Sequence, residues 1–259
     1  MTIDKRIIGE QNKLAVLTNL HRFGWLTSRM LAELIWPTAS QATILARRTV
    51  KAMIEDKLIL RRTLPSGGDC FTLSAAGARR LLNDAGIEAV SGKSLPLGNP
   101  LHRACANWYA IQQMSAGHAV WTEHEVQCGR APLVSIDGKT PDVLLETEYG
   151  LVWVEVENAW KNRAERTKIL NFSIHNLAPY ERQKELVPNS YLFRLTIVGT
   201  NSDSLRAMWR TFKDAFIREQ ISEAQVSNID FVLLPVDKGL RQGETKDGNL
   251  LYDGLLPYL

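Results

Sequence analysis

Residues 91–100, SGKSLPLGNP, limit the fold of this chain most strongly, because the hydrophobic pattern differs on their two sides. The stretch holds two Gly, two Pro and two Ser, a composition typical of a linker. Before it, apolar residues recur with helical spacing, whereas after it apolar runs of strand length alternate with helical segments. We therefore predict two domains, residues 1–90 and residues 101–259, joined by residues 91–100.

The first domain is predicted to contain three helices, a two-stranded hairpin and a fourth helix. The first helix is expected over residues 9–23, and polar residues that favour helix N-caps precede the other three, namely Thr27, Ser40 and Ser74. Two β-like runs, LILRRTL and CFTL, flank the turn PSGGD. This order is typical of a winged helix-turn-helix domain, whose third helix enters the major groove of DNA.

The predicted third helix and the hairpin carry polar and basic side chains suited to DNA binding. These candidates are Gln41, Thr43, Arg47, Arg48 and Lys51 on the helix, and Arg61 and Arg62 on the hairpin. Residues 1–95 hold 14 Lys and Arg against 8 Asp and Glu, whereas the remainder holds 17 against 20. Because excess basic charge favours a polyanion, we expect the first domain to bind double-stranded DNA. A solvated helix face or a protein-docking winged helix would carry similar charges.

The second domain is predicted to be α/β with a central mixed sheet, which makes the whole chain α/β, or α+β overall. Residues 101–116 have a helical pattern, and TPDVLLET and LVWVEVEN form two strand-like runs joined by a tight turn. AVWTEHEVQ fits a strand or a short helix. Its Glu123, His124 and Glu125 are expected in a surface loop, and the alternative is that they add an acid to the three acidic residues described next. A long charged helix is expected over residues 160–185, followed by strand, helix and strand. Residues 238–259 receive no assignment.

Three acidic residues lie in or beside the two strand-like runs. Asp142 comes just before the first run, and Glu155 and Glu157 lie within the second. Residues two apart on a strand face the same side, so the three carboxylates are expected to converge. Because buried carboxylates are costly unless they are paired or bind a metal, we predict a Mg²⁺ or Mn²⁺ site. The alternative is that the glutamates face solvent or pair with nearby Lys and Arg side chains.

The spacing of these acids resembles the PD-(D/E)xK nuclease superfamily, whose domain is restriction-endonuclease-like. Pro141 and Asp142 match the Pro-Asp at the start of one strand, and Glu155 matches the acid of the next strand. Glu157 stands where the family has its usual lysine, which makes an inactive nuclease-like domain a second interpretation.

The resemblance implies metal-dependent DNA cleavage, with a lysine supplied from elsewhere in the chain. It assigns the metal ligands as Asp142, Glu155 and Glu157, and the catalytic residues as these three acids with Lys161. Lys161 lies near the start of the predicted long helix, and Lys168 is the second choice for the same role. A positive group at this place would stabilise charge on the scissile phosphate.

The two halves together resemble the replication-relaxation family, and within it the MobC-type relaxases and mobilisation proteins. The resemblance rests on LSAAGARRL, LHRACANWY, PDVLLE and WVEVEN and spans residues 10–235. It implies a nicking endonuclease that acts at an origin of transfer in plasmid or mobile-element conjugation, with other relaxosome proteins as partners. His102 matches a family histidine, for which a structural role is favoured over a catalytic one.

Two other functions fit the same sequence. One is a non-catalytic DNA-binding protein, such as a replication initiator, repressor or relaxosome accessory, with a degenerate nuclease-like domain. The other is a nuclease subunit that makes double-strand breaks, which a homodimer with paired sites would favour. The chain has no apolar run of transmembrane length, no secretory h-region and only three cysteines without CxxC spacing, so we expect a cytoplasmic protein with no membrane partner.

Overall fold

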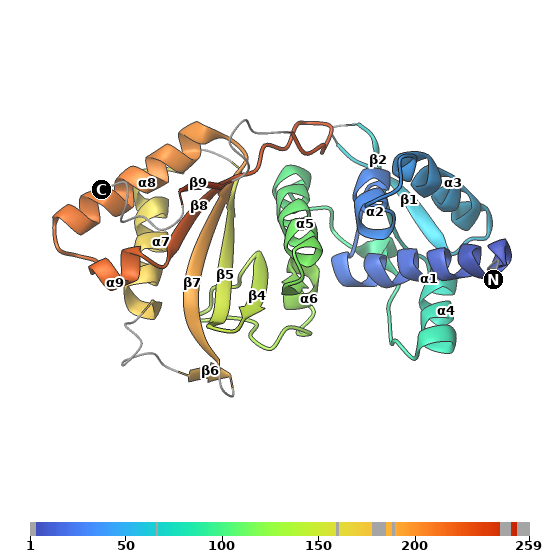
Figure 1. The fold of residues 1–259 in the computed structure, drawn as a ribbon, viewed down its shortest axis with the longest axis horizontal. Helices are drawn as coiled ribbons and strands as arrows, with labels where there is room; N and C mark the ends of the chain where they lie inside the picture. Colours follow the sequence, from blue (N-terminus) through green and yellow to red (C-terminus); the bar gives the residue numbers. More distant parts are fainter. Residues whose placement is uncertain are drawn as a thin grey trace. The chain divides into compact units, whose positions relative to one another are not determined.

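The computed structural model describes residues 4–65, 67–158, 161–177, 185–187, 190–243 and 250–252. The chain forms two compact units, Met1–Pro100 and Leu101–Leu259, and Figure 1 shows their helices and strands. The mixed α/β class predicted from the sequence is confirmed. In the part of the chain that the structure describes, every helix is too short or too polar to cross a membrane.

The first unit contains helices and one small antiparallel hairpin. Its elements are α1 (Lys5–Phe23), α2 (Ser28–Ile35), α3 (Ala42–Glu55), β1 (Ile59–Thr63), β2 (Asp69–Leu73), α4 (Ala75–Ala85) and a 3-10 turn, η1 (Gly92–Ser94). The two strands pair antiparallel, with Ile59 opposite Leu73. The order of three helices, hairpin and fourth helix is the order predicted, with η1 lying in the stretch predicted as a linker.

Side-chain caps explain where two of these helices begin. The Thr27 hydroxyl accepts a hydrogen bond from the Met30 N–H at the start of α2, and Ser74 does the same for Gly77 at the start of α4. The prediction that Ser40 caps the third helix is wrong, because Gln41 is the N-cap residue and its side chain makes no capping bond. Instead the backbone N–H of Ala42 bonds to the carbonyl of Ala39, so the helix continues from a backbone turn.

Apolar side chains from all three leading helices, together with Trp25 between α1 and α2, fill the interior of the first unit. The buried set includes Val16, Leu17, Leu20, Trp25, Met30, Leu31, Ala46, Val50 and Met53. The α3 members follow the predicted helical spacing, except that Ile54 is only half-buried. Burying this face of α3 turns its opposite, polar face toward solvent.

The second unit is a sheet with helices on both faces. Its elements are α5 (Pro100–Ser115), β3 (Ala119–Thr122), α6 (Glu123–Gln127), β4 (Val143–Thr147), β5 (Gly150–Glu157), α7 (Arg163–Asn176), β6 (Glu185–Val187), β7 (Ser190–Gly199), α8 (Ser202–Ile217), α9 (Glu223–Val226), β8 (Ile229–Leu233) and β9 (Leu250–Tyr252). The segment AVWTEHEVQ forms both of the structures that its pattern allows, because β3 is followed directly by α6.

The sheet of the second unit is mixed, as predicted. Its strand order is β3-β4-β5-β7-β8-β9, with β6 paired to β7. The β5–β7 and β7–β8 pairs are parallel and the others antiparallel. Parallel neighbours need a crossover connection, which α7 and α8 supply. Both helices cover one face of the sheet, and α5 covers the other (Figure 1).

Strand β5 lies near the centre of the sheet, and every one of its residues is buried. Trp153 packs toward α7, where its ring lies 4.8 Å from that of Phe172 between centroids. Helix α7 is shorter than predicted, because Asn162 caps its start and it ends at Asn176. Pro179 follows in the sequence, and proline cannot continue a helix. The rest of the predicted helix, residues 178–184, lies outside the described residues.

Candidate functional site

The three predicted acids meet at the carboxyl end of β5. Strand pairing places Val143 opposite Val154, and the Asp142 N–H donates to the Val154 carbonyl at 2.9 Å. Asp142 therefore lies beside Glu155, although the two are far apart along the chain. We call Asp142, Glu155 and Glu157 the acid cluster.

Asp142 has a structural contact in addition to any chemical role. One of its carboxylate oxygens accepts a 2.8 Å hydrogen bond from the Val156 N–H, so the side chain continues the backbone ladder of the strand pair. The same oxygen lies 3.3 Å from Nε2 of His102 on α5. An alanine at position 142 would leave a backbone N–H without its acceptor, whereas asparagine keeps an acceptor oxygen there.

Glu155 is buried between two donors from different parts of the chain. Trp153 Nε1 donates to its Oε1 at 2.5 Å, which shows that residues two apart on β5 face the same side, as predicted. Lys139 Nζ lies 2.6 Å from the same oxygen and also lies over the Phe172 ring. Lys139 comes from a turn before β4 and was not among the residues predicted from the sequence.

Glu157 pairs with the lysine that the sequence singled out. Lys161 Nζ lies 2.5 Å from Oε1 of Glu157, whose side chain is only 3% exposed. Arg166 of α7 donates a hydrogen bond to the Lys161 carbonyl and so fixes the backbone just before the helix. Lys168, the second choice, lies exposed on α7. The structure thus brings Lys161, together with Lys139, to the acid cluster.

Burial and mutual repulsion act together on the acid cluster. Burial raises the pKa of Glu155, the attraction of Lys139 opposes this rise, and the charge of Asp142 adds to it. Burial likewise raises the pKa of Glu157, against the attraction of Lys161 and with repulsion from the other two acids. These carboxylates therefore favour a bound proton or an added cation more than an exposed glutamate does.

Two further groups from the other side of the sheet act on this site. Burial alone would lower the pKa of His102, but its hydrogen bond and attraction to Asp142, with attraction from Glu123 and Glu157, raise it. Glu123 is the first residue of α6, not part of a surface loop as predicted. Burial raises its pKa against the attraction of Arg103, whose Nε lies 3.8 Å from Oε2 of Glu123.

The donor chemistry of the acid cluster suits a hard divalent cation, because all of its candidate ligands are carboxylate oxygens. As they stand, however, the described residues contain no group of three His, Cys, Asp or Glu side chains arranged to hold a metal ion. Each acid instead contacts its own basic group, which is His102, Lys139 or Lys161. A metal at this place would have to displace at least one lysine.

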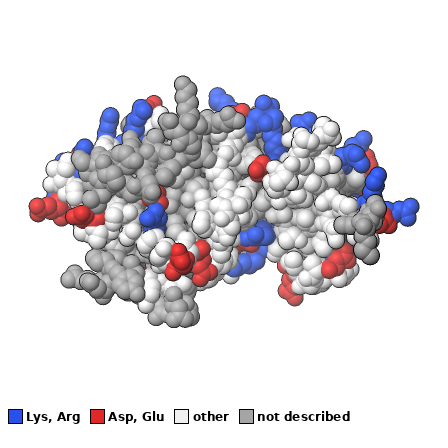
Figure 2. All heavy atoms as spheres, viewed as in Figure 1, with Lys and Arg blue, Asp and Glu red and all other residues white. Residues whose placement is uncertain are grey.

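The predicted DNA-binding residues of α3 lie on its outer face. Gln41, Arg47, Arg48 and Lys51 are exposed and Thr43 is half-buried. Ile44, on the same helix, is an apolar side chain that is 58% exposed. In the view of Figure 2 the Lys and Arg side chains of the first unit, on the right, lie mainly along its rim.

The two hairpin arginines differ from each other. Arg61 is 63% exposed and its Nε lies 3.3 Å from Asp69 of the paired strand. Arg62 is half-buried, and its guanidinium donates to the carbonyls of Gly92 and Leu95. Arg62 therefore anchors the segment around η1 to the hairpin, a role that its position in the sequence did not suggest.

The chain matches no protein-family model, and comparisons with curated proteins and with solved structures find no significant match.

Proposed function

We propose that this chain is a DNA endonuclease that binds duplex DNA through its first unit and cleaves a strand at the acid cluster with Mg²⁺ or Mn²⁺. The observation that carries the proposal is the gathering of Asp142, Glu155 and Glu157 beside Lys161 at one end of β5. Glu155 and Glu157 are buried and Asp142 is half-buried, and carboxylates that repel one another at such a place are costly in a fold that makes no use of them. The strand–turn–strand–helix order of this region also supports the resemblance to PD-(D/E)xK nucleases.

Each residue of the site has a role in this proposal. Asp142 and Glu155, with Glu157, would hold the ion, which when bound would activate water and offset charge on the phosphate. Lys161, whose side chain is one-third exposed, would turn from Glu157 to the scissile phosphate. His102 would keep the Asp142 carboxylate in place.

The first unit would supply the DNA affinity as a winged helix-turn-helix. Its outer α3 face offers Arg47, Arg48 and Lys51 to phosphates or guanine edges, and Gln41 to adenine. The exposed Ile44 is suited to an apolar contact such as a thymine methyl group. The resemblance to the replication-relaxation family points to an origin of transfer as the DNA site, with nicking of one strand and other relaxosome proteins as partners.

A second candidate is a DNA-binding protein without catalysis, such as a repressor, replication initiator or relaxosome accessory. The specific observation in its favour is that each acid of the cluster already contacts a basic group within the chain. In that case the lysines would replace the metal permanently and the cluster would serve only the stability of the sheet. The same first unit would bind DNA under either proposal.

Incubation with supercoiled plasmid separates these candidates. The plasmid should carry the DNA that flanks the gene, and lanes with Mg²⁺, Mn²⁺ or EDTA should be run for the wild-type chain and for Asp142→Asn. We expect metal-dependent relaxed circles that the variant does not produce. Glu146→Gln is the matched control, because Glu146 is an exposed carboxylate on the neighbouring strand β4.

Each outcome decides between the proposals. Relaxed circles from the wild type and from Glu146→Gln, but not from Asp142→Asn, would support a nicking enzyme with its site at the acid cluster. Linear product would indicate double-strand cleavage. Intact plasmid in all lanes, with a specific gel shift, would favour the non-catalytic candidate. Equal nicking by wild type and Asp142→Asn would show that the acid cluster takes no part in the reaction.

A further inference from the structure

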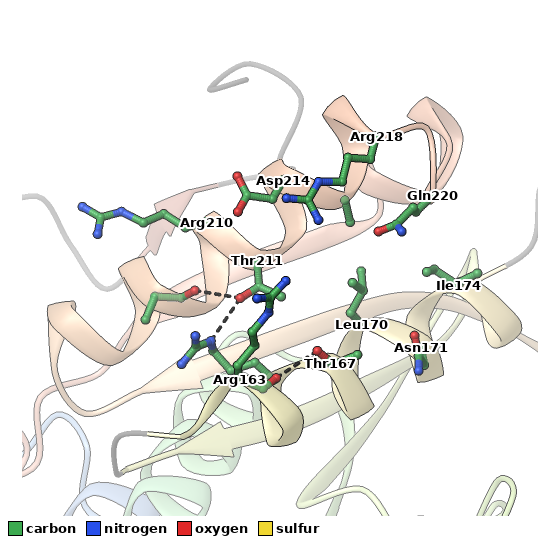
Figure 3. Close-up of a pocket in the computed structure, with 13 residues that line it drawn as sticks. Arg163, Thr167, Leu170, Asn171, Ile174, Arg210, Thr211, Asp214, Arg218 and Gln220 are labelled. Carbon is green, nitrogen blue, oxygen red and sulfur yellow. Dashed lines mark hydrogen bonds between the residues drawn. The ribbon is translucent and has the colours of Figure 1, made fainter.

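A groove runs between α7 and α8 on the solvent side of the two helices. Its volume is about 730 Å³, and its walls come from one face of each helix (Figure 3). On α7 the lining extends from Arg163 to Ile174, which is about 16 Å of helix at 1.5 Å per residue. The residues assigned above to cleavage or to duplex binding do not line it.

The charge of this groove is strongly unbalanced. Among the described residues that line it, four are arginines, against the single acid Asp214: Arg163 and Arg166 of α7, Arg210 of α8 and Arg218 just after α8. Arg163, Arg210 and Arg218 are exposed, so they are available to a ligand. Planar guanidinium groups bind phosphate oxygens in pairs, and several along one groove favour a ligand with several phosphates.

Arg166 joins the groove to the acid cluster. Its Nε donates to Thr211 Oγ1 at 3.1 Å, which ties α7 to α8, and its Nη1 donates to the carbonyl of Lys161. Lys161 in turn contacts Glu157 of the cluster. The end of the groove near Arg166 therefore lies beside the place where we propose that a strand is cut.

We infer that the α7–α8 groove binds the phosphate backbone of a DNA strand next to the acid cluster. The identity of the ligand as DNA rests on the proposed function, whereas the preference for a polyphosphate rests on the groove itself. Phosphates follow one another along a strand at a spacing of a few ångström, so about 16 Å accommodates several of them. Clusters of arginine also recognise acidic peptide motifs, so an acidic peptide is the competing ligand. The connection of Arg166 through Lys161 to the acid cluster favours a DNA strand, and the experiment below includes a polyglutamate competitor.

Fluorescence anisotropy of the full-length chain tests this inference. The probe is a labelled mixed-sequence single-stranded oligonucleotide of about 12 nucleotides, in EDTA to prevent cleavage, within the size range of single-strand sites. The background carries Arg47→Gln, Arg48→Gln and Lys51→Gln, so that the first unit contributes little. On this background the groove variant is Arg163→Gln, Arg210→Gln, Arg218→Gln.

A matched variant removes the same number of charges from the same unit outside the groove. Arg206→Gln, Lys238→Gln, Arg241→Gln is suitable because all three side chains are exposed and none lines the groove. We expect the groove variant to bind the oligonucleotide at least about tenfold more weakly, and its salt slope to fall by about 2, which is three contacts at about 0.7 each. The matched variant should change affinity less than about twofold, since charges away from a contact act weakly through salt.

Two results would overturn the inference. One is an equal loss in the groove variant and the matched variant, which would mean that only net charge matters. The other is competition by polyglutamate as strong as that by unlabelled oligonucleotide, which would assign the groove to an acidic polypeptide. A duplex probe of the same length, run in parallel, shows whether the groove variant loses affinity for single-stranded DNA, for duplex DNA or for both. A loss of affinity that occurs in the groove variant and not in the matched variant supports the inference with either probe.

The failure of this inference can be told apart from failure of the proposed function. Asp142→Asn should keep oligonucleotide binding at the wild-type level, because Asp142 does not line the groove. If the wild type binds the oligonucleotide through the groove but nicks no plasmid, DNA binding by the groove is supported and the proposed cleavage is not. If the wild type nicks plasmid and the groove variant binds and nicks as well as the wild type, the proposed cleavage is supported and the groove takes no part in it.

Discussion

The α3 face and the acid cluster hold their charges in different ways. Arg47, Arg48 and Lys51 project from a helix surface into solvent, whereas Glu155 and Glu157 are buried and each contacts a lysine. Exposed cations attract a polyanion over a distance and are screened by salt. Buried acids interact with their immediate neighbours, and their effect depends on protonation. The function of the first unit should therefore depend on salt concentration. The function of the second unit should depend on pH and on the charges close to the acid cluster.

The largest effect should come from Glu155→Gln, measured as the initial rate of plasmid nicking in Mg²⁺. Glutamine keeps an oxygen for the Trp153 N–H but removes the charge proposed to hold the cation. We expect a loss of at least about 10²-fold, in the range seen when one electrostatic contact to a transition state is removed.

Duplex binding distinguishes a loss of chemistry from a loss of DNA contact in Glu155→Gln. Its duplex dissociation constant should stay within about twofold of the wild-type value, because Glu155 is buried in the second unit. Equal losses in nicking and in duplex binding would contradict this division of roles, because the acid cluster would then contribute to DNA affinity.

The next largest effect is expected on the α3 face. The variant Arg47→Gln, Arg48→Gln, Lys51→Gln should weaken duplex binding by about 10- to 100-fold at low salt and reduce the salt slope by about 2.7, or 0.9 for each lost phosphate contact. Fluorescence anisotropy at several salt concentrations measures both quantities. The reduction in slope is the sharper of the two, because it counts contacts directly.

A charge-matched control for the α3 variant uses basic residues elsewhere in the first unit. Arg6→Gln, Arg79→Gln, Lys93→Gln removes the same charge from three exposed positions. Its salt slope should remain that of the wild type. If both variants lose slope equally, the basic charge acts as a diffuse field and α3 is not the contact surface.

Local signals explain why most of the fold could be predicted. The caps at Thr27 and Ser74, and the apolar spacing of α3, depend on residues within one or two turns of each other. The Ser40 prediction was wrong because a backbone bond from Ala42 to Ala39 satisfies the helix start, and nothing in the residue types reveals that bond. The acids of β5 could likewise be placed on one face, because a strand alternates its side chains.

The partners of those acids could not be predicted in the same way. Lys139 reaches Glu155 from a turn that is not part of either strand, and His102 reaches Asp142 from a helix on the other face of the sheet. Such contacts depend on how separate elements pack, which a single sequence does not show. Lys161 could be found because it lies four residues from Glu157 in the chain.

Lys139→Met tests how far the acid cluster depends on its internal cations. Removing one partner of a fully buried ion pair costs about 3–5 kcal/mol. Since the Lys139 side chain is 30% exposed, we expect about 1–3 kcal/mol in the free energy of unfolding, measured by urea denaturation. Adding Glu155→Gln to this variant should recover part of the loss, because no uncompensated charge then remains. A double variant no more stable than the single one would mean that Lys139 contributes packing over Phe172 and not charge.

The smallest effect should be the pH dependence of the contact between His102 and the acids that face it. The folded-state pKa of His102 is raised above its ordinary value of 6.5, and the groups that face it are Asp142, Glu123 and Glu157. A raised pKa means that the stabilisation is complete below pH 6.5 and is lost as pH rises through the folded pKa. The stability advantage of the wild type over His102→Gln should therefore shrink as pH increases from about 6 to about 9.

Urea denaturation at each pH measures this difference in stability, and an NMR titration of the His102 ring measures its pKa directly. A constant stability difference with an unshifted ring titration would show that His102 is neutral beside Asp142, and that pH control of this cluster rests on its glutamates alone.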